Sequence, residues 1–245
     1  MDPVNNPSPP PAPKRSREFH NLMTRREKIA GWIWLPLHIV ILPQLIAWAA
    51  YLLMHGRMPD DLTLNAWYYL LGLVFLLVTQ FKFFRENYRI FTTDFRNALV
   101  TMLLGFVILM VCGRLISILT ALFGQLPSSP NQEAVETLAG VDMRRMAASA
   151  VIMAPIVEEA LFRGMIFGSI RPKSRVLAYV VSMVVFALYH VWSYAIMYRS
   201  LTPLVSGAAY LPIAFVLCFC YDRTESIWTP IFFHMFYNAL ALSVM

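Results

Sequence analysis

The chain is poor in charged residues, which make up 14% of its 245 residues, whereas soluble domains carry roughly 25%. Hydrophobic residues reach 58%, and no polar stretch is long enough to form a soluble domain. These proportions argue against an ordinary soluble enzyme. They predict an all-α fold in the form of a polytopic transmembrane helix bundle.

Other signals are also missing. Three cysteines, Cys112, Cys218 and Cys220, lie in apolar runs without the spacing of a disulfide framework, a zinc finger or a redox motif. There is no His-Glu-x-x-His sequence, which excludes a zinc protease of the soluble type. No internal repeat of transporter-like period is present. The net charge of +6 arises from basic residues in short stretches between apolar runs, so it reports membrane topology and predicts no nucleic-acid partner.

The sequence divides into three parts, namely a tail (1–28), a first group of transmembrane helices with an interfacial loop (29–145), and a second transmembrane region (146–245). Six prolines among the first 13 residues predict a disordered, extended tail. The end of the tail holds six basic residues between Lys14 and Lys28. We expect there either an amphipathic helix on the membrane surface from Phe19 onward or a simple basic flank.

Seven apolar runs predict about seven to eight transmembrane spans, because prolines inside some runs could divide a helix. The predicted spans are residues 29–54, 64–81, 97–123, 146–170, 176–196, 204–221 and 227–245. Residues 82–96 are expected to form a polar loop, and residues 124–145 an interfacial loop with a short amphipathic helix. The basic stretches 14–28, 82–96 and 171–175 share one side if every span crosses. The N-terminus is therefore predicted to be cytoplasmic.

The fourth span contains Glu158, Glu159 and Arg163 in an otherwise apolar sequence. Each charge at a helix centre costs roughly 2.5–3.5 kcal/mol in membrane insertion unless partners or water compensate it. Glu159 and Arg163 are four residues apart, so they share a helix face and can pair. Glu158 points about 100° away from that face and has no such partner. Pro155, three residues earlier, is expected to disturb the local helix.

Two later spans carry further polar groups in apolar surroundings. His190 lies in the sequence Phe-Ala-Leu-Tyr-His, and His234 and Asn238 are four residues apart on one helix face. Singly, each histidine fits a buried core residue. Together with the charges of the fourth span they predict a functional site, because ionisable groups inside a membrane usually mark one.

The chemistry of this set suits hydrolysis of an amide. Glu158 in a cavity of low dielectric is a general base for water, and Asn238 or a protonated His234 could donate a hydrogen bond to a developing oxyanion. Glu158, His190 and His234 could instead hold a catalytic Zn²⁺, which leaves the metal question open. Glu159 and Arg163 would orient Glu158.

The three motifs are Glu158-Glu159-x-x-x-Arg163, Phe186-x-x-x-His190 and His234-x-x-x-Asn238. In this order, on successive membrane helices, they resemble the CPBP family of intramembrane proteases. That family includes the type II CAAX prenyl endopeptidases and bacteriocin-processing or immunity (Abi) proteins. The resemblance covers residues 146–245, and every position of the motifs is present.

The resemblance implies a role for each motif residue. Glu158 and His190 would activate the water, and His234 and Asn238 would stabilise the oxyanion or contribute to a metal site. Glu159 and Arg163 would hold the geometry. Members of the family are described both as metalloproteases and as metal-free proteases that use glutamate, and this sequence does not distinguish the two.

The leading hypothesis is an intramembrane endopeptidase that acts on a membrane-associated peptide, such as a prenylated protein or a leader peptide. Its partners would be that substrate and membrane lipids. One alternative is a non-catalytic membrane scaffold or self-immunity protein that retains the site. Another is a proton-coupled transporter that uses the same residues as a relay. Without any organelle signal, a bacterial cytoplasmic membrane is the expected location.

Overall fold

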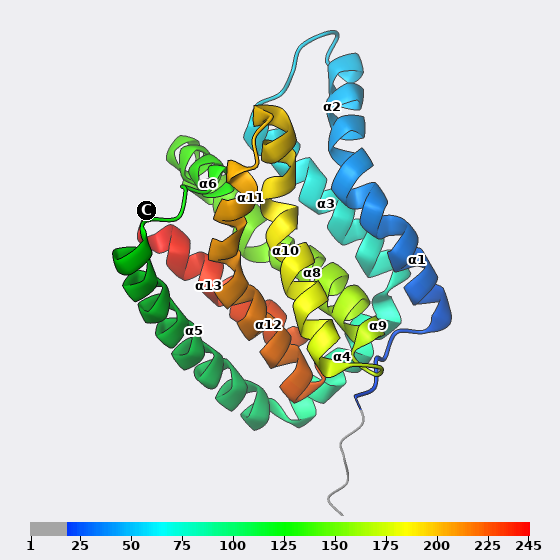
Figure 1. Ribbon diagram of the computed structural model, residues 1–245. Helices are drawn as coiled ribbons and strands as arrows, with labels where there is room; N and C mark the ends of the chain where they lie inside the picture. The colour runs from blue at the N-terminus through cyan, green and yellow to red at the C-terminus, as the bar shows by residue number, and fades with distance from the viewer. Residues whose placement is uncertain (1–18) are drawn as a thin grey trace, which may run out of the picture.

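The computed structural model describes residues 19–245, and the first 18 residues of the predicted tail lie outside the described residues. All regular secondary structure in the described part is helical, without a strand. The predicted all-α fold is therefore confirmed, and Figure 1 shows the helices gathered into one bundle.

The helices between residues 25 and 141 pass twice through the length of the bundle before the chain reaches its longest helix. They are α1 (Arg25–Pro36), the π-helix η1 (Leu37–Ile41), α2 (Leu42–Leu53), α3 (Asp61–Thr79), α4 (Phe81–Thr93), α5 (Phe95–Phe123) and α6 (Pro130–Val141). The π-helix η1 lies between Pro36 and Pro43, where a kinked or broken helix was predicted. Proline removes a backbone donor and disturbs the regular ladder.

The remainder of the chain, from residue 143 onward, begins with a run of short helical segments and also contains three longer helices. They are α7 (Met143–Ala147), η2 (Ala148–Met153), α8 (Ala154–Glu159), η3 (Ala160–Phe167), α9 (Gly168–Ile170), α10 (Arg175–Tyr198), α11 (Thr202–Ser206), η4 (Gly207–Tyr210), α12 (Leu211–Thr224) and α13 (Trp228–Ser243). Both η2 and η3 are π-helices, and η4 is a 3₁₀-helix.

Several helices have the length and composition of membrane spans. Five described stretches qualify, namely Arg25–Leu53, Asp61–Thr79, Phe95–Phe123, Arg175–Tyr198 and Thr202–Thr224. The two other predicted spans correspond to the run from α7 to α9 and to α13. The protein is thus an integral, multi-pass membrane protein. The count of seven to eight spans and the cytoplasmic N-terminus stay predictions.

The prediction of a polar loop over residues 82–96 is wrong, because most of this stretch forms α4. One side of the helix is buried and holds Phe83, Phe84, Asn87 and Phe91. The exposed residues of the helix include Lys82, Arg85 and Arg89. The sequence is amphipathic with helical period. The loop was predicted because the stretch is rich in basic residues, although its apolar residues recur on one helix face.

The expected amphipathic helix from Phe19 is also absent, since residues 19–24 have no regular secondary structure and α1 begins at Arg25. Phe19 packs edge-on against Phe167 and Tyr221. The side chain of Asn21 donates a hydrogen bond to the carbonyl of Gly164 at 3.1 Å. This segment therefore lies against the core of the bundle and not free on a surface.

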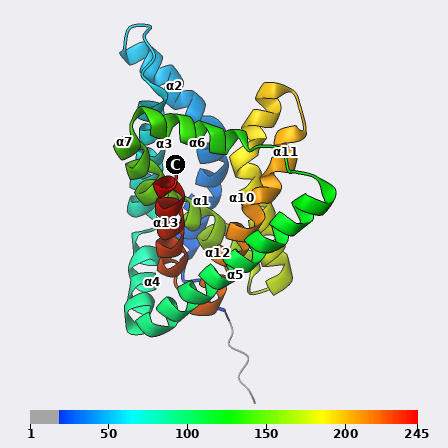
Figure 2. The ribbon, with the colours of Figure 1, turned by 90° about the vertical axis from the view of Figure 1, so that its left-hand side faces the viewer.

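The bundle has two different ends. At the lower end of Figure 1 lie residues 19–24, the start of α1, α4 and the turn between α9 and α10. The start of α1, α4 and this turn carry described basic residues of the three basic stretches. At the other end, α6 crosses over the bundle beside the end of α13, as Figure 2 shows. The long helix α5 leans against α12 and α13 and exposes apolar side chains on its outer face.

Candidate active site

The run from α7 to α9 forms the inner wall of the site. Every residue of η3 is buried, and so are Glu158 and Glu159 at the end of α8. π-helical segments leave carbonyl groups outside the regular ladder, and side chains from neighbouring elements use three of them. The side chain of Asn238 donates to the carbonyl of Ala150, that of Ser182 to Phe162, and that of Asn21 to Gly164.

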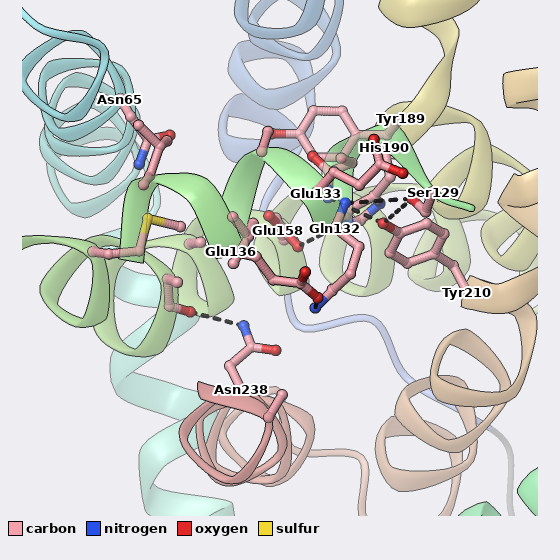
Figure 3. Close-up of a pocket in the computed structure, with 18 of the residues that line it drawn as sticks. Asn65, Ser129, Gln132, Glu133, Glu136, Glu158, Tyr189, His190, Tyr210 and Asn238 are labelled. Atoms are coloured by element: carbon pink, nitrogen blue, oxygen red, sulfur yellow. Dashed lines mark hydrogen bonds and ion pairs between the residues drawn. The ribbon is translucent and has the colours of Figure 1, made fainter. Parts of the chain in front are cut away.

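A cavity of about 860 Å³ opens along one side of this wall. It is lined by residues from α3, α6, α8, α10 and α13, among them Glu158, His190, His234 and Asn238. Figure 3 shows Glu158, His190 and Asn238 around this space, together with polar side chains of α6. Four of the six predicted site residues thus line one cavity, and the other two, Glu159 and Arg163, are buried behind it.

The carboxylate of Glu158 faces the cavity with its two oxygens in different surroundings. Oε1 accepts a hydrogen bond of 3.0 Å from the hydroxyl of Tyr69 on α3. Oε2 lies 3.9 Å from Nε2 of His190 and 3.9 Å from Nε2 of His234. These two separations are too long for direct hydrogen bonds. The three atoms therefore remain available for a group placed between them, such as a water molecule.

The orientation of His190 is fixed from its other nitrogen. Nδ1 lies 2.8 Å from the carbonyl oxygen of Phe186 one turn earlier. Since a carbonyl can only accept, Nδ1 carries the proton, and a neutral ring keeps the lone pair of Nε2 toward the cavity. The ring of Tyr210 stacks on the imidazole at 4.4 Å, which holds the ring plane in place.

Behind the cavity, Glu159 and Arg163 form a fully buried ion pair with an Nη1–Oε1 distance of 3.1 Å. Arg163 also donates to the carbonyl of Ala214 on α12 at 3.1 Å, and its guanidinium lies 4.3 Å from the ring centre of Phe186. The arginine therefore joins three elements of the wall. It also fixes the residue whose carbonyl orients His190.

His234 connects the two carboxylates. Its Nδ1 lies 2.9 Å from Oε1 of Glu159, while its Nε2 faces Glu158. The carboxylate of Glu159 accepts from Nδ1, so this nitrogen carries a proton. Glu159 thus sets both the orientation and the tautomer of the histidine that borders the cavity.

Asn238, the remaining motif residue, is tied to the wall. Its Nδ2 donates to the carbonyl of Ala150 in η2 at 2.7 Å, an interaction drawn in Figure 3. An amide nitrogen has two hydrogens, so one is left for another acceptor. This bond holds α13 against the π-helical segment that precedes Pro155.

The donor atoms facing the cavity, one carboxylate oxygen and two imidazole nitrogens, are of the kind that binds zinc. The described residues nevertheless contain no group of three His, Cys, Asp or Glu side chains arranged to hold a metal ion. In this structure Glu158, His190 and His234 are therefore not arranged as a Zn²⁺ site.

Three features of this site were not predicted from the sequence, namely Tyr69, Tyr210 and the polar face of α6. Tyr69 appears in the sequence only as a tyrosine within an apolar span. Such a residue can face lipid or the core of the bundle, so its position alone does not indicate a site. Tyr210 holds α6 in place, because its hydroxyl lies 2.9 Å from Ser129 Oγ and 3.1 Å from Asn131 Nδ2. Only the tertiary structure brings these groups to the cavity.

Comparison with known proteins gives two matches to the part of the chain that carries the motifs. Residues 142–240 match the family described as "Type II CAAX prenyl endopeptidase Rce1-like". The resemblance to the CPBP family is confirmed. These residues, called the CPBP-like region below, contain all six predicted site residues.

A curated protein of Bacillus subtilis (strain 168), named "Putative membrane peptidase YdiL", is 31% identical over 122 residues. The match covers 49% of this chain and 45% of that protein. The aligned part thus spans less than half the length of the curated relative. No solved structure is significantly similar to the chain.

Proposed function

We propose that the protein is an intramembrane endopeptidase that hydrolyses a peptide bond with a water molecule activated by Glu158 and His190. One observation carries the proposal: an oxygen of Glu158 and the Nε2 atoms of His190 and His234 converge on one cavity. The family and the Bacillus relative are both named as peptidases, which supports the same reaction class.

The first step is removal of a proton from water. A water bound between Glu158 Oε2 and His190 Nε2 donates to both acceptors, and Glu158 takes the proton as the oxygen attacks the carbonyl carbon of the substrate. A general base placed in this way contributes about 10²–10⁴-fold to the rate. Fixing both acceptors in advance avoids the cost of ordering them during the reaction.

The second step needs a donor to the oxyanion and a proton for the leaving amine. The remaining amide hydrogen of Asn238, or a protonated His234 Nε2, supplies the hydrogen bond to the oxyanion. Glu158 then returns its proton to the amine nitrogen as the carbon–nitrogen bond breaks. Glu159 and Arg163 take no part in proton transfer, because they lie behind the cavity and hold His234 and the wall in place.

The cavity also limits the charge of the substrate. Its lining contains Glu133 and Glu136 of α6 in addition to Glu158, and no lysine or arginine among the described residues. A free carboxylate placed there meets only negative charge, which is unfavourable. We propose a membrane-associated peptide segment that is neutral or positively charged next to the scissile bond.

The bundle and its apolar helices place this chemistry at a membrane. A bacterial cytoplasmic membrane is the proposed location, because the chain shows similarity to a bacterial relative. The transporter alternative predicts repeated halves, which the order of elements does not show in the described residues. The scaffold alternative predicts an intact site without cleavage, so it is decided by an activity measurement.

The test is cleavage of a panel of fluorogenic membrane peptides by purified protein. Wild type is compared with Glu158→Ala and His190→Ala, each with and without a strong chelator. The matched control is Glu86→Gln, a carboxylate on α4 at the opposite end of the bundle. Loss of cleavage in both site variants, with the control unaffected, supports the proposal. Cleavage by the site variants at the wild-type rate overturns it.

Peptide pairs in the panel test the substrate charge. Each pair has one sequence, with either a free carboxyl terminus or an amide close to the scissile bond. We expect the amide to be cleaved about fivefold faster, since about 1 kcal/mol separates two charges at short distance in a solvated mouth. In Glu133→Gln/Glu136→Gln the difference shrinks, whereas in Asp61→Asn, an exposed carboxylate outside the cavity lining, it persists. Equal cleavage of both peptides contradicts the proposed charge.

A further inference from the structure

Tyr69 lies outside the CPBP-like region and still contacts its central carboxylate. It belongs to α3, 89 positions before Glu158 in the sequence, and its hydroxyl donates to Glu158 Oε1 at 3.0 Å. We infer that Tyr69 is a positioning residue, which fixes the Glu158 carboxylate so that its other oxygen faces the two histidines. This inference rests on the proposed hydrolysis and extends the site to the first part of the chain.

The face of α3 explains how the hydroxyl reaches Glu158. Leu62, Gly72 and Leu76 are buried and mark the side of α3 that packs inward, and Tyr69 lies one turn before Gly72. A Cβ on Gly72 would lie 2.8 Å from His38 Cε1 and 3.3 Å from Val157 Cγ1. A side chain at position 72 would therefore collide with His38 of η1 and press against Val157 of α8. Val157 is the residue that precedes Glu158.

The neighbouring tyrosine cannot replace Tyr69 in this role. The hydroxyl of Tyr68 lies 3.1 Å from that of Tyr189 on α10, and the ring of Tyr68 stacks on His38 at 4.3 Å. Tyr68 therefore links α3 to η1 and α10. Among the hydrogen bonds of the described residues, Tyr69 is the one side chain that donates to Glu158.

The physical effect follows from the freedom of a glutamate side chain. The terminal torsion of glutamate is broad and roughly two-fold, so an unrestrained carboxylate exchanges its two oxygens and tilts easily. A hydrogen bond to Oε1 removes this freedom and holds Oε2 at equal distances of 3.9 Å from His190 and His234. Without Tyr69 the Glu158 carboxylate remains in the cavity, but its Oε2 atom faces the bound water for a smaller fraction of the time.

The bond itself can be tested without turnover. Infrared difference spectra of protein with ¹³C-labelled glutamate would identify the carboxyl stretching band of Glu158 as the one lost in Glu158→Gln. We expect this band to shift in Tyr69→Phe, which keeps the ring and removes the donor. The matched control Tyr237→Phe removes a hydroxyl from another residue of the cavity lining and should leave the band in place. An unmoved band in Tyr69→Phe overturns the inference.

A second variant and a kinetic measurement test what the bond does. Gly72→Ala, whose new methyl group collides with His38 and presses against Val157, should displace α3 and shift the same band while retaining the tyrosine. In Tyr69→Phe we expect kcat to fall about tenfold, as for loss of one hydrogen bond to a charged group, with KM changed less than twofold. An unchanged kcat overturns the positioning role. A wild type that cleaves nothing, together with a shifted band, overturns the proposed function and leaves the bond established.

Discussion

Glu158 and Glu159 are consecutive residues of α8 with opposite surroundings. The cluster around Glu158, called the front cluster, comprises Tyr69, Glu158 and His190 and lines the cavity. The cluster around Glu159, called the rear cluster, comprises Glu159, Arg163 and the carbonyl of Ala214, and it is buried. Polar groups in the front cluster face space for a reactant, whereas those in the rear cluster face one another.

The difference separates chemistry from stability within one turn of helix. A carboxylate with one free oxygen at a cavity can accept a proton, and its neutralisation costs the fold little. A buried ion pair contributes no chemistry, but removal of one partner leaves an uncompensated charge in the interior. His234 touches both clusters through its two nitrogens. Its substitution should therefore combine both effects.

The largest expected effect is on activity in the front cluster. Glu158→Gln keeps the shape of the side chain and removes the base, so kcat should fall by about 10²–10⁴-fold. The midpoint of thermal unfolding in lipid nanodiscs should stay the same or rise, because a buried charge is removed. If Glu158→Gln loses activity because it unfolds, the front cluster contributes to stability and the proposed difference between the two clusters is wrong.

The next effect is on stability in the rear cluster. Arg163→Met leaves Glu159 without its cation and should lower the free energy of unfolding by about 3–5 kcal/mol. The double variant Glu159→Gln/Arg163→Met should lose less than the sum of the two single variants, since neither charge is then left alone. Unfolding monitored by denaturant titration measures both. Additive losses would show that the two residues do not act as a pair.

A smaller and mixed effect is expected for His234. His234→Ala removes a hydrogen bond to a charged group, so unfolding should become easier by about 1.5–3 kcal/mol. Turnover should fall as well, but less than in Glu158→Gln, because Asn238 still offers an amide hydrogen. Parallel measurements of kcat and of the unfolding midpoint test this. If only kcat or only the unfolding midpoint falls, His234 acts in one cluster and not in both.

The smallest effect is expected from metal removal. The described residues contain no three-ligand group arranged to hold a metal ion, so a chelator should leave kcat within about twofold of the untreated value. The control is a metal replacement series with Zn²⁺, Co²⁺ and Mn²⁺ after chelation. Activity lost on chelation and regained with one of these ions would show that the histidines rearrange to bind it.

Much of this arrangement is visible in the sequence. The cost of charge in an apolar span singled out Glu158, Glu159 and Arg163, and helical spacing correctly paired the latter two. Pro155 predicted a local disturbance, and the π-helices η2 and η3 flank the short helix that contains it. The helical content and the presence of several membrane helices follow from hydropathy alone.

The remainder depends on tertiary structure. The spacing of Glu158 and Glu159 cannot show which of them faces a cavity, because that depends on where α3 and α13 pack. Tyr69 reaches the site where α3 packs against α8, and the missing side chain of Gly72 leaves room there for His38 and Val157. The basic residues of α4 predicted a polar loop, but its phenylalanines recur on one helix face and are buried by neighbouring helices.

The most direct test of the central claim, that Glu158 activates a water molecule for peptide hydrolysis, is a single turnover in ¹⁸O-labelled water. A membrane peptide is mixed with excess protein, and the new carboxyl group is analysed by mass spectrometry. The account predicts one ¹⁸O atom in the carboxyl product of wild type, and product from Glu158→Gln only at a rate lower by about 10²–10⁴-fold. Label-free product from wild type, or labelled product from Glu158→Gln at the wild-type rate, would contradict it.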